Sequence, residues 1–301
     1  MQIVNSLMPA APRLAVAGAG TPNNRRMNRR RALLLSAGGL AAWPLRLPAQ
    51  QRRSLSDPLR LGVDPALMQS GLGPALQRAF GRDTGVAVQL VATASLPLLE
   101  ALDRGELDAA LANASEAEAK FEAQGLVHDR REVARGEFVL VGPAGPGRSP
   151  DPAGLTGAAS VTEALVRLAE AARAQPGTLV FLSAGDGSGT HLAEQALWRQ
   201  ARIAPEAPWY RAASPGTGFA AQVAAVRAWA LVERGAWTAA GAARSFVLLR
   251  PAATERAGVE RVHVMRAFRV SHPAAKIFIG WIAGPPGRRI VAAQPGYRTP
   301  P

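Results

Sequence analysis

Short apolar runs alternate with amphipathic helical stretches from Leu59 onward, and this alternation constrains the fold more than any other feature. The expected strands cover residues 59–63, 86–91, 107–112 and 138–141. The expected helices cover residues 71–82, 96–103 and 115–124, the last with Ser115 as cap and Glu118 completing a capping box. This alternation predicts an α/β fold with mostly parallel sheets and argues against all-β and helical-bundle folds.

A second block of the same kind follows a segment rich in proline and glycine. Residues 142–157 form this predicted linker, and the next expected elements are helices at 161–174, 191–201 and 219–228 and a strand at 179–182. Two α/β blocks predict two lobes, which we expect to comprise residues 57–142 plus 259–301 and residues 143–258. Residues 239–264 show no pattern clear enough to assign.

The positive charge is concentrated near the start of the chain. The sequence has 35 basic and 22 acidic residues and a formal net charge of +13. Nine arginines fall within residues 1–53, and the first acidic residue is Asp57. A charged arm on a nearly balanced body is typical of a tail with its own function.

This arm has the order of an export signal. Arg29, Arg30 and Arg31 precede an apolar run that ends at Trp43, and a small residue, Ala49, follows a short polar-flanked segment. The pattern predicts a twin-arginine-type signal peptide over residues 1–49, cleaved near Ala49, and hence the twin-arginine export machinery as a partner and a periplasmic protein. Residues 1–26 are an upstream extension if translation starts at Met27.

Two alternatives for the arm are weaker. An apolar run of about 11 residues is too short to span a membrane, which needs roughly 20. A nucleic-acid-binding arm does not explain the uncharged apolar stretch directly after the arginines, and aromatics make up only 5% of the chain. We therefore expect no nucleic-acid partner.

Enzyme motifs are absent from the sequence. The chain has no cysteine, and its four histidines lack metal-ligand spacing. In the glycine-rich segment at residues 185–189, Ser188 is not at the centre of a G-x-S-x-G elbow, and Leu192 replaces the third glycine of a dinucleotide fingerprint. Ser188 and His191 are too close in sequence to align as nucleophile and base. We expect no catalytic residue, metal or cofactor.

Several segments, in order, resemble the periplasmic tungstate-binding family, solute-binding proteins that deliver tungstate or molybdate to ABC transporters. The matching residues are Ser70-Gly71-Leu72, Thr84-Gly85, Leu107-Asp108-Ala109, Ser115-Glu116-Ala117-Glu118, Lys120-Phe121, Arg130-Arg131-Glu132-Val133, Glu137-Phe138-Val139-Leu140-Val141-Gly142-Pro143, Gly185-Asp186, Ser188-Gly189-Thr190-His191, Glu194, Leu197-Trp198, Pro208-Trp209-Tyr210, Gly216, Gly218 and Arg234-Gly235. The resemblance covers residues 57–240 and extends more weakly to 297.

The resemblance implies a two-lobed type II periplasmic binding protein fold, with a mixed, mostly parallel sheet in each lobe and a ligand cleft between them. It also implies a monomer that captures a small anion such as tungstate and passes it to an ABC transporter permease.

Candidate ligand-binding residues are sought where strands lead into helices. The unpaired backbone N–H groups at the start of a helix attract anions, so these junctions are favourable sites for an anionic ligand. Most of them have an ordinary alternative. Residues 183–191 can be a plain strand–turn–helix connection with Ser188 or Thr190 as cap, and Ser95 can likewise be a helix cap. Thr217 can lie in a flexible turn, and Arg234 can form a surface ion pair with Glu233. The candidates are Asp64, Ser95, Ser183, Asp186, Ser188, Gly189, Thr190, Thr217 and Arg234.

The sequence departs from the family pattern at two places. Val63-Asp64-Pro65-Ala66 replaces a hydroxyl-rich run, and Ala184 stands where the family tends to have arginine. These changes remove hydrogen-bond donors for an anion, and Asp64 would repel an anion. They leave the fold inference intact. Three hypotheses remain: an oxyanion-binding transport protein, the same fold with a small organic ligand or one whose positive charge faces Asp64 and Asp186, and a periplasmic sensor outside transport.

Overall fold

A computed structural model describes residues 53–145, 154–216, 218–241, 246–269 and 272–301. The predicted signal peptide and its cleavage site near Ala49 lie outside the described residues, as does Thr217. Within the described part of the chain, no helix is both long and apolar enough to cross a membrane.

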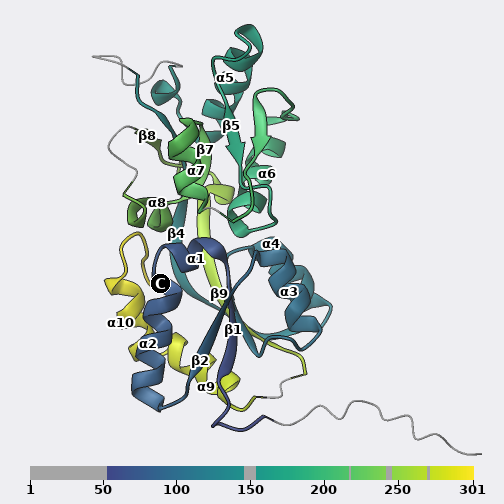
Figure 1. Cartoon of the computed structure of the whole chain (residues 1–301), viewed down its shortest axis with the longest axis vertical. Coiled ribbons are helices and arrows are strands. Elements are labelled where there is room, and N and C mark those ends of the chain that lie inside the picture. Colours follow the sequence, from purple (N-terminus) through teal and green to yellow (C-terminus); the bar gives the residue numbers. More distant parts are fainter. Residues whose placement is uncertain (1–52, 146–153, 217, 242–245, 270–271) are drawn as a thin grey trace, which may run out of the picture. The chain divides into compact units, whose positions relative to one another are not determined.

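The described elements form two lobes (Figure 1). The first lobe contains β1 (Leu59–Val63), α1 (Pro65–Gln69), α2 (Leu72–Thr84), β2 (Val88–Ala92), α3 (Ser95–Asp103), β3 (Ala109–Ala112), α4 (Ser115–Ala123), β9 (Val259–Ala267), α9 (Ala274–Ala283) and α10 (Pro285–Ala293). The second contains the 3-10 turn Leu155–Gly157, α5 (Val161–Ala174), β5 (Phe181–Ser183), α6 (Gly189–Ala201), β6 (Tyr210–Ala212), α7 (Phe219–Val226), β7 (Ala230–Glu233), α8 (Arg234–Ala239), β8 (Phe246–Leu249) and the 3-10 turn Arg256–Gly258.

One long strand, β4 (Val127–Pro143), belongs to both lobes. Its first part pairs antiparallel with β9 in the first lobe, and its last residues pair with β7 and β8 in the second. Figure 1 shows β4 and β9 side by side where the chain passes from one lobe to the other. The covalent connection between the lobes is therefore a pair of hydrogen-bonded strands.

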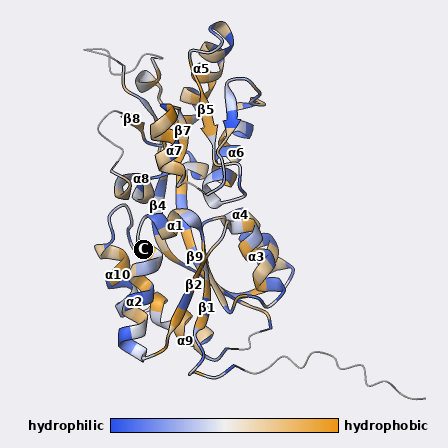
Figure 2. Ribbon diagram, in the orientation of Figure 1, coloured by the Kyte–Doolittle hydropathy of each residue, from blue (hydrophilic) through white to orange (hydrophobic). Residues whose placement is uncertain are grey.

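Each lobe has apolar cores on both faces of its sheet. In the first lobe, α2, α9 and α10 cover one face, where Phe80 and Phe278 meet edge to face at 5.1 Å, and α3 covers the other. Helix α9 is mostly hydrophobic in Figure 2, as expected of a helix that packs on a core. In the second lobe, the fully buried Trp198 and Trp229 fill the core beneath α5 and α6.

Most predicted elements are confirmed with shifted ends. Helix α5 matches the expected range, whereas α6 begins two residues earlier than expected, at Gly189. Ser115 is the first residue of α4 and does not cap it, so the expected capping box does not form; the Glu118 carboxylate instead accepts the backbone N–H of Ala114, one residue earlier than expected.

The expectation of mostly parallel sheets was too simple. Parallel pairing joins β1 to β2 and β3, and β5 to β6, whereas β4 and β9 pair antiparallel with all their described neighbours. The sequence indicated only the last residues of β4, because charged residues on its exposed side interrupt the apolar pattern before Phe138. Strand β9 lies in the stretch that received no assignment.

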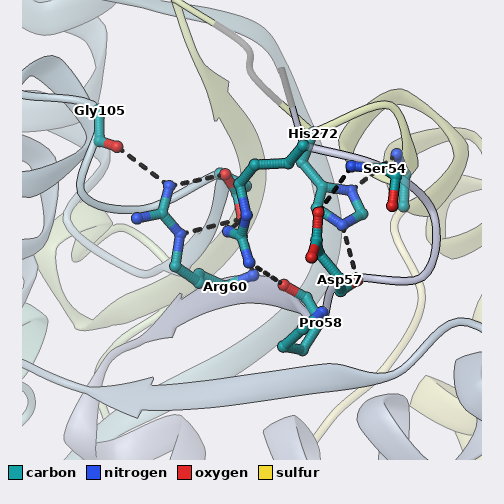
Figure 3. A network of polar contacts seen from close by, with 9 residues as sticks. Ser54, Asp57, Pro58, Arg60, Gly105 and His272 are labelled. Atoms are coloured by element: carbon teal, nitrogen blue, oxygen red, sulfur yellow. Dashed lines mark hydrogen bonds and ion pairs between the residues drawn. The ribbon is translucent and has the colours of Figure 1, made fainter. Parts of the chain in front are cut away.

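The segment that leads into β1 is fixed by a polar network (Figure 3). Arg53 and Arg60 both form ion pairs with the buried Asp108, at 2.7 and 2.9 Å, and Arg60 also donates to the Gly105 carbonyl. His272 contacts the Asp57 carbonyl at 2.9 Å. These bonds hold the start of the described chain against the first lobe.

Candidate functional site

The loop between β5 and α6 is folded by its own hydrogen bonds. Ser188 caps α6 by accepting the backbone N–H of His191 at 3.3 Å, and Asp186 accepts the backbone N–H of Ser188 at 2.9 Å. The Gly187 N–H donates to Nδ1 of His191 at 3.0 Å. Burial lowers the pKa of His191, with the Asp186 carboxylate opposing the shift, so the ring is neutral at pH 7. The ordinary reading of Ser188 as a helix cap is therefore correct.

The first residue of α6 is a glycine because the first lobe approaches it closely. A Cβ at Gly189 would lie 1.9 Å from the Asn113 Oδ1 atom and 2.8 Å from the Asn113 carbonyl oxygen. No side chain fits in that space, so only glycine allows the start of α6 to meet the end of β3.

Asp64 lies between β1 and α1 and contacts the same helix end. Its Oδ1 atom accepts the backbone N–H of Ala66 at 3.1 Å, which caps α1. Its Oδ2 atom accepts the hydroxyl of Ser95 at 2.6 Å and the backbone N–H of Gly189 at 3.0 Å. One carboxylate from the first lobe thus receives hydrogen bonds from three parts of the chain, including a helix N-terminus of the second lobe.

Burial raises the pKa of Asp64 to about 6. The hydrogen bonds from Ser95, Gly189 and Ala66 oppose this shift, and the Asp186 carboxylate adds to it. The side chain is completely buried, yet at pH 7 most molecules carry its negative charge. The three donors and the N-terminal end of the α6 dipole make that charge tolerable.

Ser95 does not cap its own helix. It is the first residue of α3, whose capping position is Ala94 without a side-chain bond. Its hydroxyl donates instead to Asp64, and the Asn113 Oδ1 atom lies 3.5 Å away. The interpretation of Ser95 as a helix cap is therefore wrong, and its side chain instead bonds to the carboxylate that contacts the second lobe.

A chain of further buried polar groups lies behind Asp64. The Asn113 amide donates to Glu260 Oε1 at 2.7 Å, and Glu233 caps α8 by accepting two backbone N–H groups. Burial and the neighbouring carboxyl group of Glu233 raise the pKa of Glu260, and burial also raises that of Glu233. The Tyr297 hydroxyl contacts the Ser70 hydroxyl at 2.9 Å.

Asn113, Glu233 and Glu260 are not among the site residues expected from the sequence. Asn113 directly follows a predicted strand, a position that could have identified it. Glu260 lies in the unassigned stretch, and Glu233 entered only as an expected surface partner of Arg234.

A cavity of about 600 Å³ lies beside Asp64 and opens between the lobes. Pro65, Ala66, Gln69 and Ala92 line it from the first lobe. The second lobe contributes Ala184, Gly185, Asp186, Ser188, Thr190, Ala213, Ser214, Pro215, Gly216, Gly218, Phe219, Ala220, Gln222, Val232, Glu233, Ala236 and Trp237. Among the described residues that line this cavity there is no lysine or arginine, whereas two of them, Asp186 and Glu233, are acidic.

The structure brings most of the predicted residues together. Asp186, Ser188 and Thr190 line the cavity, and Ser183 is buried at the end of β5. Arg234 is not part of the lining. It forms an ion pair with Glu137 at 3.1 Å, and not the surface ion pair with Glu233 that the sequence suggested. In the described part of the chain, no three acidic or histidine side chains lie close enough to hold a metal ion.

Comparison with known proteins agrees with this architecture. Residues 50–261 match the PBP superfamily domain, the domain of periplasmic binding proteins. The chain belongs to this superfamily. It adopts the two-lobed α/β fold of type II periplasmic binding proteins, and the family is one of solute-binding proteins.

Two relatives of this superfamily member share sequence with it over long stretches. The tungstate-binding protein TupA of Peptoclostridium acidaminophilum is 30% identical over 74% of this chain and 76% of its own length. A Haloferax volcanii protein described as an ABC transporter anion-binding protein is 32% identical over 53% of this chain, which spans only 44% of that protein.

A solved structure has a similar fold over most of the chain. That of the tungstate ABC transporter from Geobacter sulfurreducens superposes with a TM-score of 0.63 at 28% identity. It covers 78% of this chain and 98% of that one. The similarity therefore extends over both lobes.

Proposed function

We propose that the protein is the solute-binding component of an ABC transporter and captures a small oxyanion in the cavity between its lobes. The observation that carries this proposal is the position of the cavity, which lies at the N-terminus of α6 and is lined from both lobes. Ser188 and Thr190 add hydroxyl groups at that end of the helix, where a negative charge is favoured. The anion-binding and tungstate-binding relatives support the same ligand class.

We propose that binding involves no chemistry. Closure of the lobes on a ligand needs only complementary contacts, and the long β4–β9 pair provides a connection about which the lobes could rotate. We propose that the lobes comprise residues 57–142 plus 259–301 and residues 143–258, with the end of β4, from Phe138 on, packing in the apolar cores of the second lobe.

The remaining parts of the proposal concern the route and the partners. We propose export by the twin-arginine machinery, cleavage near Ala49, action as a periplasmic monomer, and delivery of the ligand to an ABC permease. Replacing Arg29 and Arg30 together with lysine should keep the precursor inside the cell, and N-terminal sequencing of the exported protein should begin near Gln50.

Isothermal titration of the purified protein with tungstate, molybdate and sulfate tests the ligand class. Binding of tungstate with a sub-micromolar dissociation constant supports the proposal. An absence of heat with all three anions removes it.

A second candidate is the capture of a small organic ligand, and the charge of the cavity favours it. Asp186 and Glu233 line the cavity and Asp64 lies behind it, without a lysine or arginine among the described lining residues. A volume of about 600 Å³ is also typical of sites for small organic molecules. Thermal-shift screening of amines and amino acids distinguishes this candidate, which predicts stabilisation by a ligand with a positive charge.

A third hypothesis is a sensor outside transport. It would be favoured if the genes that neighbour the gene of this protein encoded neither a permease nor an ATPase.

A further inference from the structure

Two hydrogen-bond donors at the lobe contact, beside the cavity, bind a carboxylate of the chain itself. The Ser95 hydroxyl and the Gly189 N–H both donate to Asp64 Oδ2, at 2.6 and 3.0 Å. These two donors come from different lobes and converge on one oxygen atom. Convergent N–H and O–H donors at a helix N-terminus are what a bound oxyanion requires.

We propose that Asp64 is an internal competitor of the anionic ligand and determines the specificity of the cleft. The Asp64 carboxylate lies in the donor set and must leave it before an external oxyanion can use the same donors. This inference rests on the proposed function, because it concerns the affinity for the proposed ligand class.

Charge and burial both support the proposal. Asp64 is fully buried, and its hydrogen-bond partners Ala66, Ser95 and Gly189 are all donors without a positive charge. The negative charge would repel a doubly charged anion placed beside it, and Asp186 adds a second negative charge on the cavity wall. The site therefore disfavours binding of a dianion in two ways: Asp64 occupies the hydrogen-bond donors, and the negative charges of Asp64 and Asp186 repel the dianion.

The same contact makes Asp64 a connection between the lobes. Asp64 belongs to the first lobe, and the Gly189 N–H belongs to the second. In a protein without this side chain a ligand would have to provide that connection. Asp64 thus stabilises the lobe contact in the absence of ligand.

Two substitutions separate charge from occupancy. Asp64→Asn removes the charge and keeps the shape, whereas Asp64→Ser also vacates the space near Ser95 and Gly189. Both residues cap helices as well as aspartate does, so the start of α1 is retained. Asp103→Asn removes one charge from an exposed position of the same lobe and is the matched control. Circular dichroism and thermal unfolding establish that each variant is folded.

The first measurement needs no ligand. The backbone amide resonance of Gly189 is recorded by NMR in the ligand-free protein and in each variant. We expect Asp64→Ser to move this resonance and Asp103→Asn to leave it in place. An unchanged Gly189 resonance in both Asp64 variants would show that the internal contact does not exist in solution, and the proposal would be overturned.

The second measurement is titration with tungstate and sulfate at pH 7.5. We expect Asp64→Ser to bind at least tenfold more tightly than the wild type, Asp64→Asn to gain less, and Asp103→Asn to gain nothing. Tight wild-type binding that the Asp64 variants weaken or leave unchanged overturns the inference and leaves the proposed function standing. Binding by Asp64→Ser alone supports the inference and refutes oxyanion capture by the wild type. No binding by any folded variant overturns both.

Discussion

Glu194 provides a quantitative test of how burial in the second lobe shifts the pKa of a carboxyl group. This carboxyl group lies on α6 and is almost completely buried, and the Tyr210 hydroxyl donates to its Oε1 atom at 2.7 Å. Burial raises its pKa to about 7, and hydrogen bonds from Tyr210 and from the backbone N–H of Ala184 oppose the shift. The perturbation is Glu194→Gln, which keeps the shape and an acceptor for Tyr210 and removes the ionisable group.

The expected magnitude follows from the difference between the folded and unfolded pKa values. In the unfolded chain Glu194 ionises around pH 4.5, and in the folded protein around pH 7. Between these values the folded state retains a proton that the unfolded state has lost, so the stabilisation is complete below pH 4.5 and disappears as the pH rises through 7. A shift of this size corresponds to about 3 kcal/mol, of which roughly 2.5 kcal/mol is lost between pH 5 and 8.

The assay is urea unfolding of the wild type and the variant at pH 5 and pH 8. Wild-type stability should fall over this interval, and in Glu194→Gln the fall should be smaller by about 2 to 3 kcal/mol. Thermal midpoints should differ accordingly, by roughly 5–10 °C. Glu170→Gln, at an exposed position of α5 in the same lobe, should show the wild-type dependence. Parallel stability curves for Glu194→Gln and the wild type would refute the reasoning, because they would mean that Glu194 ionises alike in both states.

Three further substitutions test the site and the core. Gly189→Ala places a methyl group 1.9 Å from Asn113 Oδ1 and should lower the free energy of unfolding, measured in urea, by about 1–3 kcal/mol. Because the contact between the lobes loosens, the radius of gyration measured by X-ray scattering should increase. Ala184→Arg adds a cation to the cavity wall and should tighten tungstate binding roughly tenfold or more in calorimetry, whereas the uncharged Ala184→Gln should not. Gly142→Ala places a Cβ 2.1 Å from the buried Trp229 ring and should destabilise the second lobe by about 1–3 kcal/mol, seen as a lower thermal midpoint with a changed tryptophan emission.

The two-lobed α/β class could be predicted because it depends on local patterns. The apolar run of β1, the helical spacing of α2 and the hydroxyl-rich start of α6 each extend over a few neighbouring residues. The candidate residues were chosen at junctions between strands and helices, and the ligand site proposed there stays a prediction.

The crossing strands could not be predicted in full. Strand β4 runs through both lobes, and its exposed and half-buried charged residues conceal the strand pattern before Phe138. Strand β9 pairs with β3 and β4, which precede it by more than a hundred residues, so nothing local specifies its register. Pairing between distant strands is decided by tertiary packing and not by local propensity.

The sequence by itself determined the fold class, the junction residues and the presence of an aspartate where the related family has hydroxyl groups. It predicted that this aspartate would repel an anion. Only the tertiary structure decided what Asp64 does, because its partners Ser95 and Gly189 lie 31 and 125 residues away in the chain. A carboxylate buried among convergent donors is stable only in that three-dimensional arrangement, since each donor offsets part of the cost of removing the charge from water.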